Sequence, residues 1–242
     1  MKSNYILISK SIFFPSSGIL AIGDLHLGYE QMLKQQGIQF PFNQLEQTKK
    51  ELKEIIEKIG KKKIKKIILL GDIKHYFSFD KREFFEIINF FNFLEKFVKK
   101  ENIILIRGNH DKIEIKNYKY QNYYIEKDLC FTHGNFLFPE ILNKKIKTIV
   151  MGHVHPAVYL KDKSNVKREK FKAFLIGKWK NKTVIVVPSF FPMVEGTDID
   201  EEYYREKGWS IVGKDVLKKF KTYLIDEKTG KVYDFGKLNK IR

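Results

Sequence analysis

The sequence predicts an α/β fold in which short buried strands end in polar loops. Five apolar runs rich in Ile, Leu and Val each stop at a Gly or a polar residue, and amphipathic segments separate several of them. A short apolar run of β-branched residues bounded by such a loop is typical of a buried strand. The five runs are residues 19–22, 67–70, 103–106, 129–131 and 149–151.

Polar residues that can bind a metal or move a proton follow each of the five runs. In open α/β sheets, ligands bind beyond the carboxyl ends of the strands, so we expect these segments to meet. All six histidines of the chain lie in them, which predicts a metal site because core histidines would not be confined to such loops. The segments are Asp24-Leu25-His26, Asp72-Ile73-Lys74-His75, Asn109-His110-Asp111, Thr132-His133-Gly134 and His153-Val154-His155.

Two helices are expected between the strands. Asn43 can cap the first, whose apolar residues share one face and which stops at Gly60. Asp80 and Glu83 form a capping box for the second. Apolar residues surround much of this second helix, so we expect it to lie between layers. The apolar residues of the two helices are Leu45, Leu52, Ile55, Ile56 and Ile59, then Phe84, Phe85, Ile87, Ile88, Phe91, Leu94, Phe97 and Val98.

The remaining strands lie at the two ends of the chain. Residues 5–14 and 18–23 read as two strands joined by a turn at 15–18. Beyond His155, residues 158–160, 174–176 and 184–187 predict a second, antiparallel sheet, and residues 226–230 predict a hairpin turn. With no repeat and no linker, we expect one domain over 1–242, with the polar segments in 24–155 and the terminal strands in 156–242.

Composition limits the class of protein. With 242 residues and 43% hydrophobic residues, the chain can bury a core without disulfides. Its one cysteine, Cys130, lies in a predicted strand and reads as a buried thiol. No apolar stretch is long enough to cross a bilayer, and the N-terminus does not read as a signal peptide. We therefore expect a cytoplasmic protein with no membrane partner.

The net charge of +17 favours a polyanionic partner, with nucleic acid first. The chain is also rich in Lys, Ile, Asn and Phe, as AT-rich coding alone would produce, and both explanations of the charge stand. The lysine-rich loop expected over residues 161–172 offers a surface along which a nucleic-acid backbone could run. Nothing in the sequence decides the oligomeric state.

The polar segments hold Asp, His and Asn but no thiolate, which suits Mn, Fe or Zn and argues against a closed structural zinc site. Two divalent ions about 3.5–4 Å apart are the usual arrangement for displacement at phosphorus. One carboxylate then bridges the ions, and a bridging water loses a proton near neutral pH. A histidine that is not a ligand can act as general acid on the leaving oxygen.

The segments, in this order, resemble the calcineurin-like metallophosphoesterase superfamily. The shared pattern is D-x-H, G-D-x-x-[DH], G-N-H-[DE], a lone H and G-H-x-H, and it spans Asp24 to His155. The resemblance implies a four-layer fold, a two-sheet β-sandwich flanked by helices, with two divalent ions, Mn first and Fe, Zn or Ni as alternatives. It implies that His110 is the catalytic histidine, oriented by Asp111. The implied ligands are Asp24, His26, Asp72 and His155 for one metal, and Asp72, Asn109, His133 and His153 for the other.

His75 narrows the resemblance. Many members have Asp at this position, whereas SbcD-type repair nucleases have His, which assists catalysis on DNA ends. The chain is also similar to the small archaeal SbcD-related phosphoesterases, which share a segment like Pro188-Ser189-Phe190. A full SbcD-type nuclease adds a DNA-binding capping domain and a docking segment for an ATPase. Neither is visible after residue 195, so an ATPase partner is not carried over.

The function expected is a Mn-dependent, nuclease-like phosphodiesterase on DNA or RNA. A metal-bridging hydroxide would attack, with His110 as general acid and His75 assisting. The alternative is a hydrolase of small phosphodiesters or phosphomonoesters, such as cyclic nucleotides, because the two metals would act in the same way on either leaving group. A third possibility is a non-catalytic scaffold. The presence of His110 and of every implied ligand argues against it. The residues expected to contact substrate are Arg107, Lys167, Arg168 and Phe190.

Overall fold

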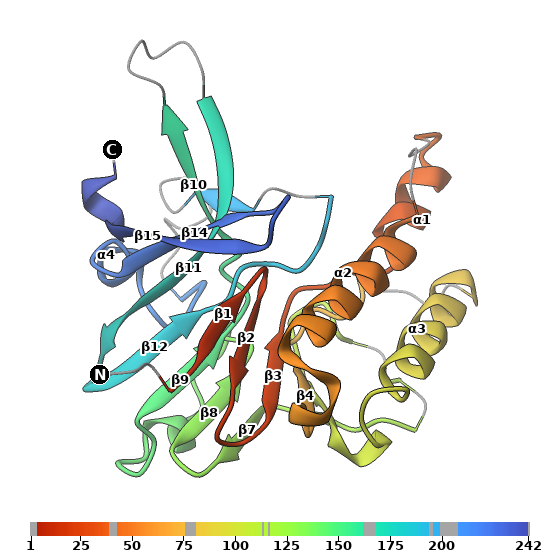
Figure 1. Ribbon diagram of the computed structural model, residues 1–242, viewed down its shortest axis with the longest axis horizontal. Coiled ribbons are helices and arrows are strands. Elements are labelled where there is room, and N and C mark those ends of the chain that lie inside the picture. The colour runs from red at the N-terminus through yellow and green to blue at the C-terminus, as the bar shows by residue number, and fades with distance from the viewer. Residues whose placement is uncertain are drawn as a thin grey trace.

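The computed structural model describes residues 4–38, 43–75, 81–112, 114–115, 117–161, 168–193, 196–198 and 208–241. Two mixed β-sheets pack face to face, and the longer helices lie together outside the first sheet (Figure 1). This arrangement confirms the predicted α/β sandwich flanked by helices.

The first sheet has six strands in the order β1 to β6. Strands β3 to β6 run parallel, so the loops after β3, β4 and β5 emerge at one edge. The single strand predicted over residues 5–14 is instead a hairpin of β1 and β2, because the chain reverses at Ser9, whose φ is 47°. The strands are β1 (Ile6–Ile8), β2 (Ser11–Phe14), β3 (Ile19–Ile22), β4 (Lys66–Leu69), β5 (Ile103–Ile106) and β6 (Tyr120–Gln121).

The second sheet has nine strands, with β14 and β15 attached to β11 beside the main path β13-β10-β11-β12-β9-β8-β7. The three strands expected to be antiparallel, β10, β11 and β12, do pair in that way. The same sheet also includes β8 and β9, and β9 pairs in parallel with both β8 and β12, so the sheet as a whole is mixed. The predicted terminal hairpin is confirmed as β14 and β15. The strands are β7 (Tyr123–Glu126), β8 (Leu129–Thr132), β9 (Thr148–Met151), β10 (Pro156–Lys161), β11 (Arg168–Trp179), β12 (Lys182–Val186), β13 (Thr197–Asp198), β14 (Lys221–Asp226) and β15 (Lys231–Lys237).

Three apolar clusters hold the layers together. Between the sheets, Phe14 of β2 meets Phe131 of β8 edge to face, with ring centroids 5.7 Å apart. The outer face of the first sheet packs on α2 and α3, and the outer face of the second packs on shorter helical segments. Burial of these faces supplies the main driving force for folding. The helical segments are α1 (Tyr29–Gln35), α2 (Gln44–Ile59), α3 (Lys81–Leu94), α4 (Lys214–Leu217), and the 3-10 turns η1 (Lys61–Lys63), η2 (Lys100–Asn102), η3 (Pro139–Leu142) and η5 (Leu238–Lys240).

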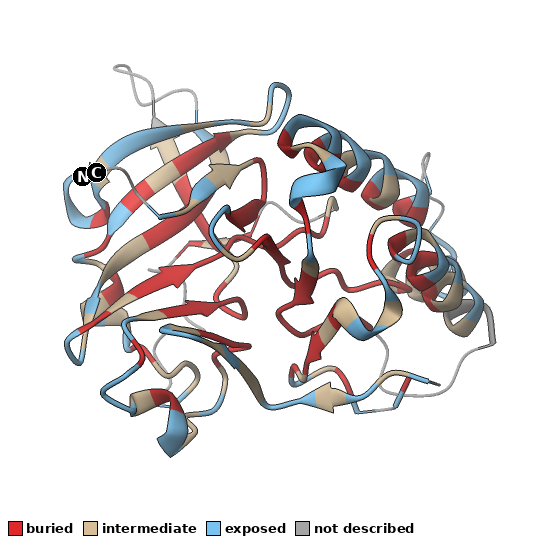
Figure 2. Ribbon diagram, turned by 60° about the horizontal axis from the view of Figure 1, so that its bottom comes forward, coloured by how far each residue is buried: buried red, intermediate tan, exposed pale blue. Residues whose placement is uncertain are grey.

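The two long helices test the predictions from periodicity. Asn43 caps α2 as predicted, since its side chain accepts a hydrogen bond from the Glu46 N–H at 3.0 Å, and all five predicted apolar residues of α2 are buried. The prediction that α3 lies between layers is wrong. This helix lies on the outside of the molecule and has both buried and exposed residues (Figure 2). Its buried residues occupy one face, and Phe85 is 69% exposed. Asp80 and the Glu83 side chain lie outside the described residues.

The loop predicted over residues 161–172 is also corrected. Residues 168–172 belong to β11 and pair with β10, so the two strands form a ribbon that extends beyond the sheet (Figure 1). Lys172, expected on a polyanion-binding surface, is buried. Cys130 is buried and free, as predicted. Among the helices of the described segments, none has the length and hydrophobicity that crossing a bilayer requires.

Replacing Asn43 by Ala should destabilise the protein by about 1 kcal/mol, because the Glu46 N–H loses its acceptor at the start of α2. Urea unfolding followed by circular dichroism measures the change. Asn89→Ala, at an exposed position inside α3, is the control and should leave stability unchanged or slightly raised. Equal loss in both variants would contradict the cap.

Candidate metal centre

The polar segments meet where the two sheets adjoin. The first sheet contributes the loops after β3, β4 and β5, and the second contributes those after β8 and β9. The backbone in these loops is strained, since five non-glycine residues have positive φ. Such conformations cost on the order of 1–3 kcal/mol each and cluster at functional sites. The five are Asp24 (56°), His26 (46°), Asp72 (48°), His153 (66°) and His155 (44°).

The side chains form two groups of donors that could each hold a metal ion. In each group the donor atoms lie within 4.8 Å of one another, and Asp72 belongs to both. Asn109, predicted as a further ligand, places its Oδ1 3.0 Å from His133 Nε2. The structure thus brings all seven predicted ligands together. The first group is Asp24, His26, Asp72 and His155, and the second is Asp72, His133 and His153.

Several buried atoms of the site lack ordinary partners, as a metal site requires. Among the described residues, His26 Nδ1 is buried and has no hydrogen-bond partner, and His155 Nε2 lies 3.1 Å from Asp24 Oδ1 without hydrogen-bond geometry. Glycines allow close approach to both carboxylates. A Cβ at Gly108 would lie 2.2 Å from Asp72 Oδ1, and one at Gly152 would lie 2.6 Å from Asp24 Oδ2. The donor set and its spacing therefore fit divalent cations.

Backbone carbonyls orient two of the histidines. His133 Nδ1 lies 2.8 Å from the Leu70 carbonyl, and His153 Nε2 lies 2.8 Å from the Trp209 carbonyl. Each carbonyl accepts a hydrogen bond from the ring N–H beside it, which leaves the other ring nitrogen to face the donor groups. Hydrogen bonds of this kind fix the tautomer of metal-binding histidines.

The two carboxylates set the electrostatics of the centre. Burial would raise the pKa of Asp24, but His155 and His133 lower it below its usual range. Asp72 behaves in the same way, since burial opposes and His133 favours its ionised form, and its pKa is lowered. Burial lowers the pKa of His133, yet the two carboxylates raise it to about 9. A proton on His133 thus offsets their charge, and a bound cation would displace it.

A third cluster contains His26, His75 and His110. The ring of His110 stacks on that of His75 with centroids 5.7 Å apart, and its Nδ1 lies 3.3 Å from the His75 carbonyl. Burial is the main cause that lowers the pKa of His75 to about 4, and the nearby His110 adds to the effect, so His75 is neutral at pH 7. His75 and His110 therefore lie beside the donor groups, as the motif order predicts.

Asp111 is predicted to orient the His110 ring, and the structure shows its carboxylate bound to backbone N–H groups. It accepts hydrogen bonds from the N–H groups of Ile73 (3.0 Å), Lys74 (3.2 Å) and Gly108 (3.0 Å). Burial raises its pKa, and the hydroxyl of Tyr120 is 3.3 Å away. Asp111 thereby ties the loop that carries His110 to the loop that carries His75.

The residues expected to contact substrate differ in their burial and in the groups that they contact. Arg107 bonds the Asp111 carbonyl at 2.8 Å and pairs with Glu114. Arg168 stacks on the ring of Tyr159 at 3.5 Å. Phe190 is fully buried in the core of the first sheet, so the prediction that it contacts substrate is corrected. Lys167 lies outside the described residues.

Two residues of the surroundings had no predicted role. Trp209 stacks on His153, with ring centroids 4.4 Å apart and planes inclined by 30°. Nothing in the spacing or composition around Trp209 indicates this contact, which joins residues 56 positions apart in the chain. Ser189 donates to the Asp24 carbonyl at 2.8 Å, and only its place in the Pro188-Ser189-Phe190 segment drew attention to it.

Trp209 should report metal binding. Adding Mn²⁺ to metal-free protein should quench its fluorescence, because a paramagnetic ion at His153 would lie within a few ångströms of the indole. Trp209→Phe should lose the response, and Trp179→Phe, which removes the other tryptophan, should keep it. A response carried by Trp179 instead would place the ion elsewhere.

Comparison with solved structures supports the fold. A nuclease, MPE, from Pseudomonas putida superposes with a TM-score of 0.58 at 18% identity, covering 96% of this chain and 100% of that one. A predicted phosphoesterase from Streptococcus pneumoniae (TM-score 0.36, 13% identity, 90% and 97% coverage) and zinc-bound Vps29 from Entamoeba histolytica (0.41, 11%, 90% and 98%) are more distant. No curated protein sequence matches the chain.

The family model of the calcineurin-like phosphoesterases matches residues 18–212, which include every polar segment described above. This match identifies the family and not a subgroup, so the similarity to the archaeal SbcD-related proteins stays a prediction. The chain belongs to the calcineurin-like phosphoesterase family.

Proposed function

We propose that this phosphoesterase is a nuclease-like phosphodiesterase that uses two divalent ions, Mn²⁺ in the first place. The observation that carries the proposal is the pair of donor groups that share Asp72, next to the stacked His75 and His110. Two ions in such groups, when bound, supply an activated water and neutralise charge on the phosphoryl oxygens. The ligands are Asp24, His26, Asp72 and His155 for one ion, and Asp72, Asn109, His133 and His153 for the other.

His110 is the proposed general acid, which protonates the leaving oxygen. Its backbone N–H donates to Asp72 Oδ1 at 2.9 Å, so the residue is held directly beside the shared carboxylate. The His75 carbonyl lies 3.3 Å from its Nδ1, and Nε2 is the atom proposed to carry the proton for the leaving oxygen. Because the His75 ring is neutral, it adds no positive charge beside His110 and does not repel the protonated form that a general acid needs.

The proposal of a nucleic-acid substrate is supported by the net charge of the chain and by the ribbon of β10 and β11. Strand β10 begins directly after His155, so the ribbon leads away from the metal centre. On the ribbon, Arg168 Cζ lies 3.5 Å from the centre of the Tyr159 ring, and Lys170 Nζ lies 5.0 Å from the same point. Cationic and aromatic groups side by side suit a phosphate backbone. The similarity to the Pseudomonas nuclease concerns the fold and does not identify the substrate.

Replacing His110 by Asn should lower kcat by about 10²–10⁴-fold, because the leaving oxygen loses its proton donor. Hydrolysis of a dinucleotide, whose leaving group is a sugar hydroxyl that must be protonated, measures kcat, and equilibrium dialysis should show Mn²⁺ stoichiometry equal to that of the unmodified protein. Undiminished turnover would refute the catalytic role, and lost metal would make His110 a ligand.

The substrate class is tested with single-stranded DNA, duplex DNA, RNA and bis-p-nitrophenyl phosphate, with Mn²⁺ and with chelator. Degradation of nucleic acid should fall steeply with added salt, since binding releases counterions from the phosphates. Arg168→Ala should weaken this activity and spare the small ester, whereas Lys178→Ala, on the same strand but at its far end, is the matched control. Cleavage of the small ester with intact nucleic acid would indicate a small-molecule phosphodiesterase.

A further inference from the structure

A buried lysine lies behind the metal centre. Lys172, near the middle of β11, is 2% exposed, and its ammonium donates hydrogen bonds to the carbonyls of Ser189, at 3.1 Å, and Phe191. Within the part of the chain that the structure describes, the carboxylate that pairs with it is that of Glu227, 4.0 Å away and about half exposed. The lysine therefore depends mainly on two backbone carbonyls for its polar contacts.

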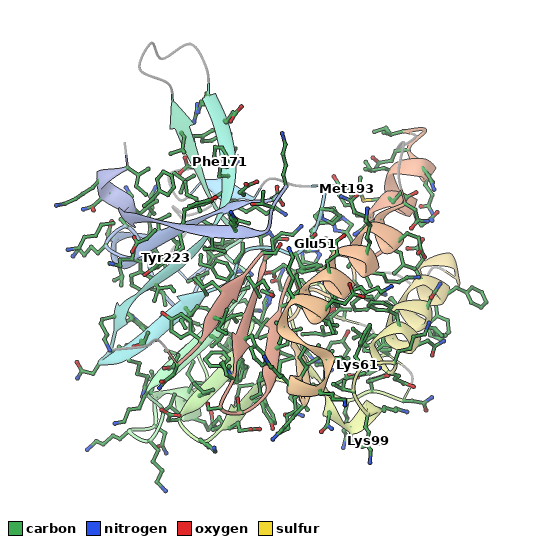
Figure 3. The ribbon with its side chains drawn as sticks, viewed as in Figure 1. Glu51, Lys61, Lys99, Phe171, Met193 and Tyr223 are labelled. Carbon is green, nitrogen blue, oxygen red and sulfur yellow. The ribbon has the colours of Figure 1, made fainter. Side chains whose placement is uncertain are left out.

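Stability does not explain why a lysine is buried at this position. Burial, together with the nearby Lys10, lowers the pKa of Lys172 to about 7. Lys10 is itself buried but pairs with Glu51 at 2.7 Å, on the side of α2 that faces the β1–β2 hairpin (Figure 3). A buried ammonium costs free energy unless it is well paired, and an apolar side chain of similar length would avoid that cost. The position of the two carbonyls gives Lys172 a different role.

The carbonyls belong to a loop that holds the backbone of Asp24. Ser189 donates its hydroxyl to the Asp24 carbonyl at 2.8 Å, and the Phe191 N–H donates to the same oxygen at 3.1 Å. The Phe190 N–H donates to the Gly23 carbonyl at 2.9 Å. Three hydrogen bonds from residues 189–191 thus fix the two peptide groups that flank the Asp24 Cα.

Asp24 needs such a restraint because its own backbone is strained. Its φ of 56° lies in the left-handed region, and its carboxylate is completely buried between His155 Nε2 and the His153 N–H. If the loop relaxed, Asp24 could leave this conformation and its oxygens would move away from the other donors. The Phe191 ring also contacts His26, with centroids 5.7 Å apart, so the same loop borders a second proposed ligand.

We propose that Lys172 is a positioning residue, which holds the 189–191 loop so that Asp24 keeps the geometry required for metal binding. The proposal rests on the proposed function, in which Asp24 is a ligand. Lys172 acts through the loop on a ligand 148 positions earlier in the chain.

Titration of metal-free protein with Mn²⁺ by calorimetry tests the proposal. Lys172→Met keeps the length of the side chain and removes the donors, and it should raise Kd for Mn²⁺ by about 10-fold or more, the effect usual for partners of metal ligands. Lys178→Met, at an exposed position on the same strand, should change Kd less than twofold. Urea unfolding of each variant confirms that it is folded at the temperature of the titration.

A double-mutant cycle separates positioning from packing. Ser189→Ala should also raise Kd, and the double variant should be weaker by less than the product of the two single effects, because both act along one connection. Independent effects that multiply, or an unchanged Kd in Lys172→Met, would overturn the proposal. If Lys172→Met does not fold, an unchanged Kd in Ser189→Ala has the same meaning. An unmodified protein that binds no Mn²⁺ would instead refute the metal centre itself.

Discussion

Two buried carboxylates, those of Asp24 and Asp72, determine what the rest of the site must provide. They are 0% and 2% exposed, and each disfavours ionisation of the other. Like charges at such depth are tolerated only with compensation. The N–H groups of His153 and His110 donate to them, and His133 gains a proton between them. The same arrangement gives divalent cations a place where their charge is required.

The compensation extends outward from the carboxylates in layers of backbone contacts. Glycines at 108 and 152 leave room for the carboxylate oxygens, and carbonyls of Leu70 and Trp209 orient the imidazoles. Behind Asp24, Lys172 and the 189–191 loop hold the strained peptide. The ligands are thus held by elements that never touch a metal, which is how preorganised sites keep their geometry.

The sequence predicts the parts of this architecture that depend on local pattern. A strand that ends in polar residues is visible in five consecutive residues, and the cap at Asn43 requires only the order of its neighbours. The position of α3 depends on which neighbours cover it, and its many phenylalanines do not reveal that Phe85 faces solvent. Lys172 was misplaced for the same reason, since a lysine among lysines does not show that its strand passes behind a metal ligand. Trp209 reaches His153 only through tertiary folding.

The donors come from both sheets. The first sheet carries Asp24, His26, Asp72 and Asn109, and the second carries His133, His153 and His155. Under the proposed assignment the two ions act as a reversible crosslink, because the sheets cannot shear past each other while the ions are bound. An ion present at one hundred times its Kd would add about 2.7 kcal/mol to the free energy of unfolding. The free energy of unfolding of this protein would then rise with the concentration of free metal.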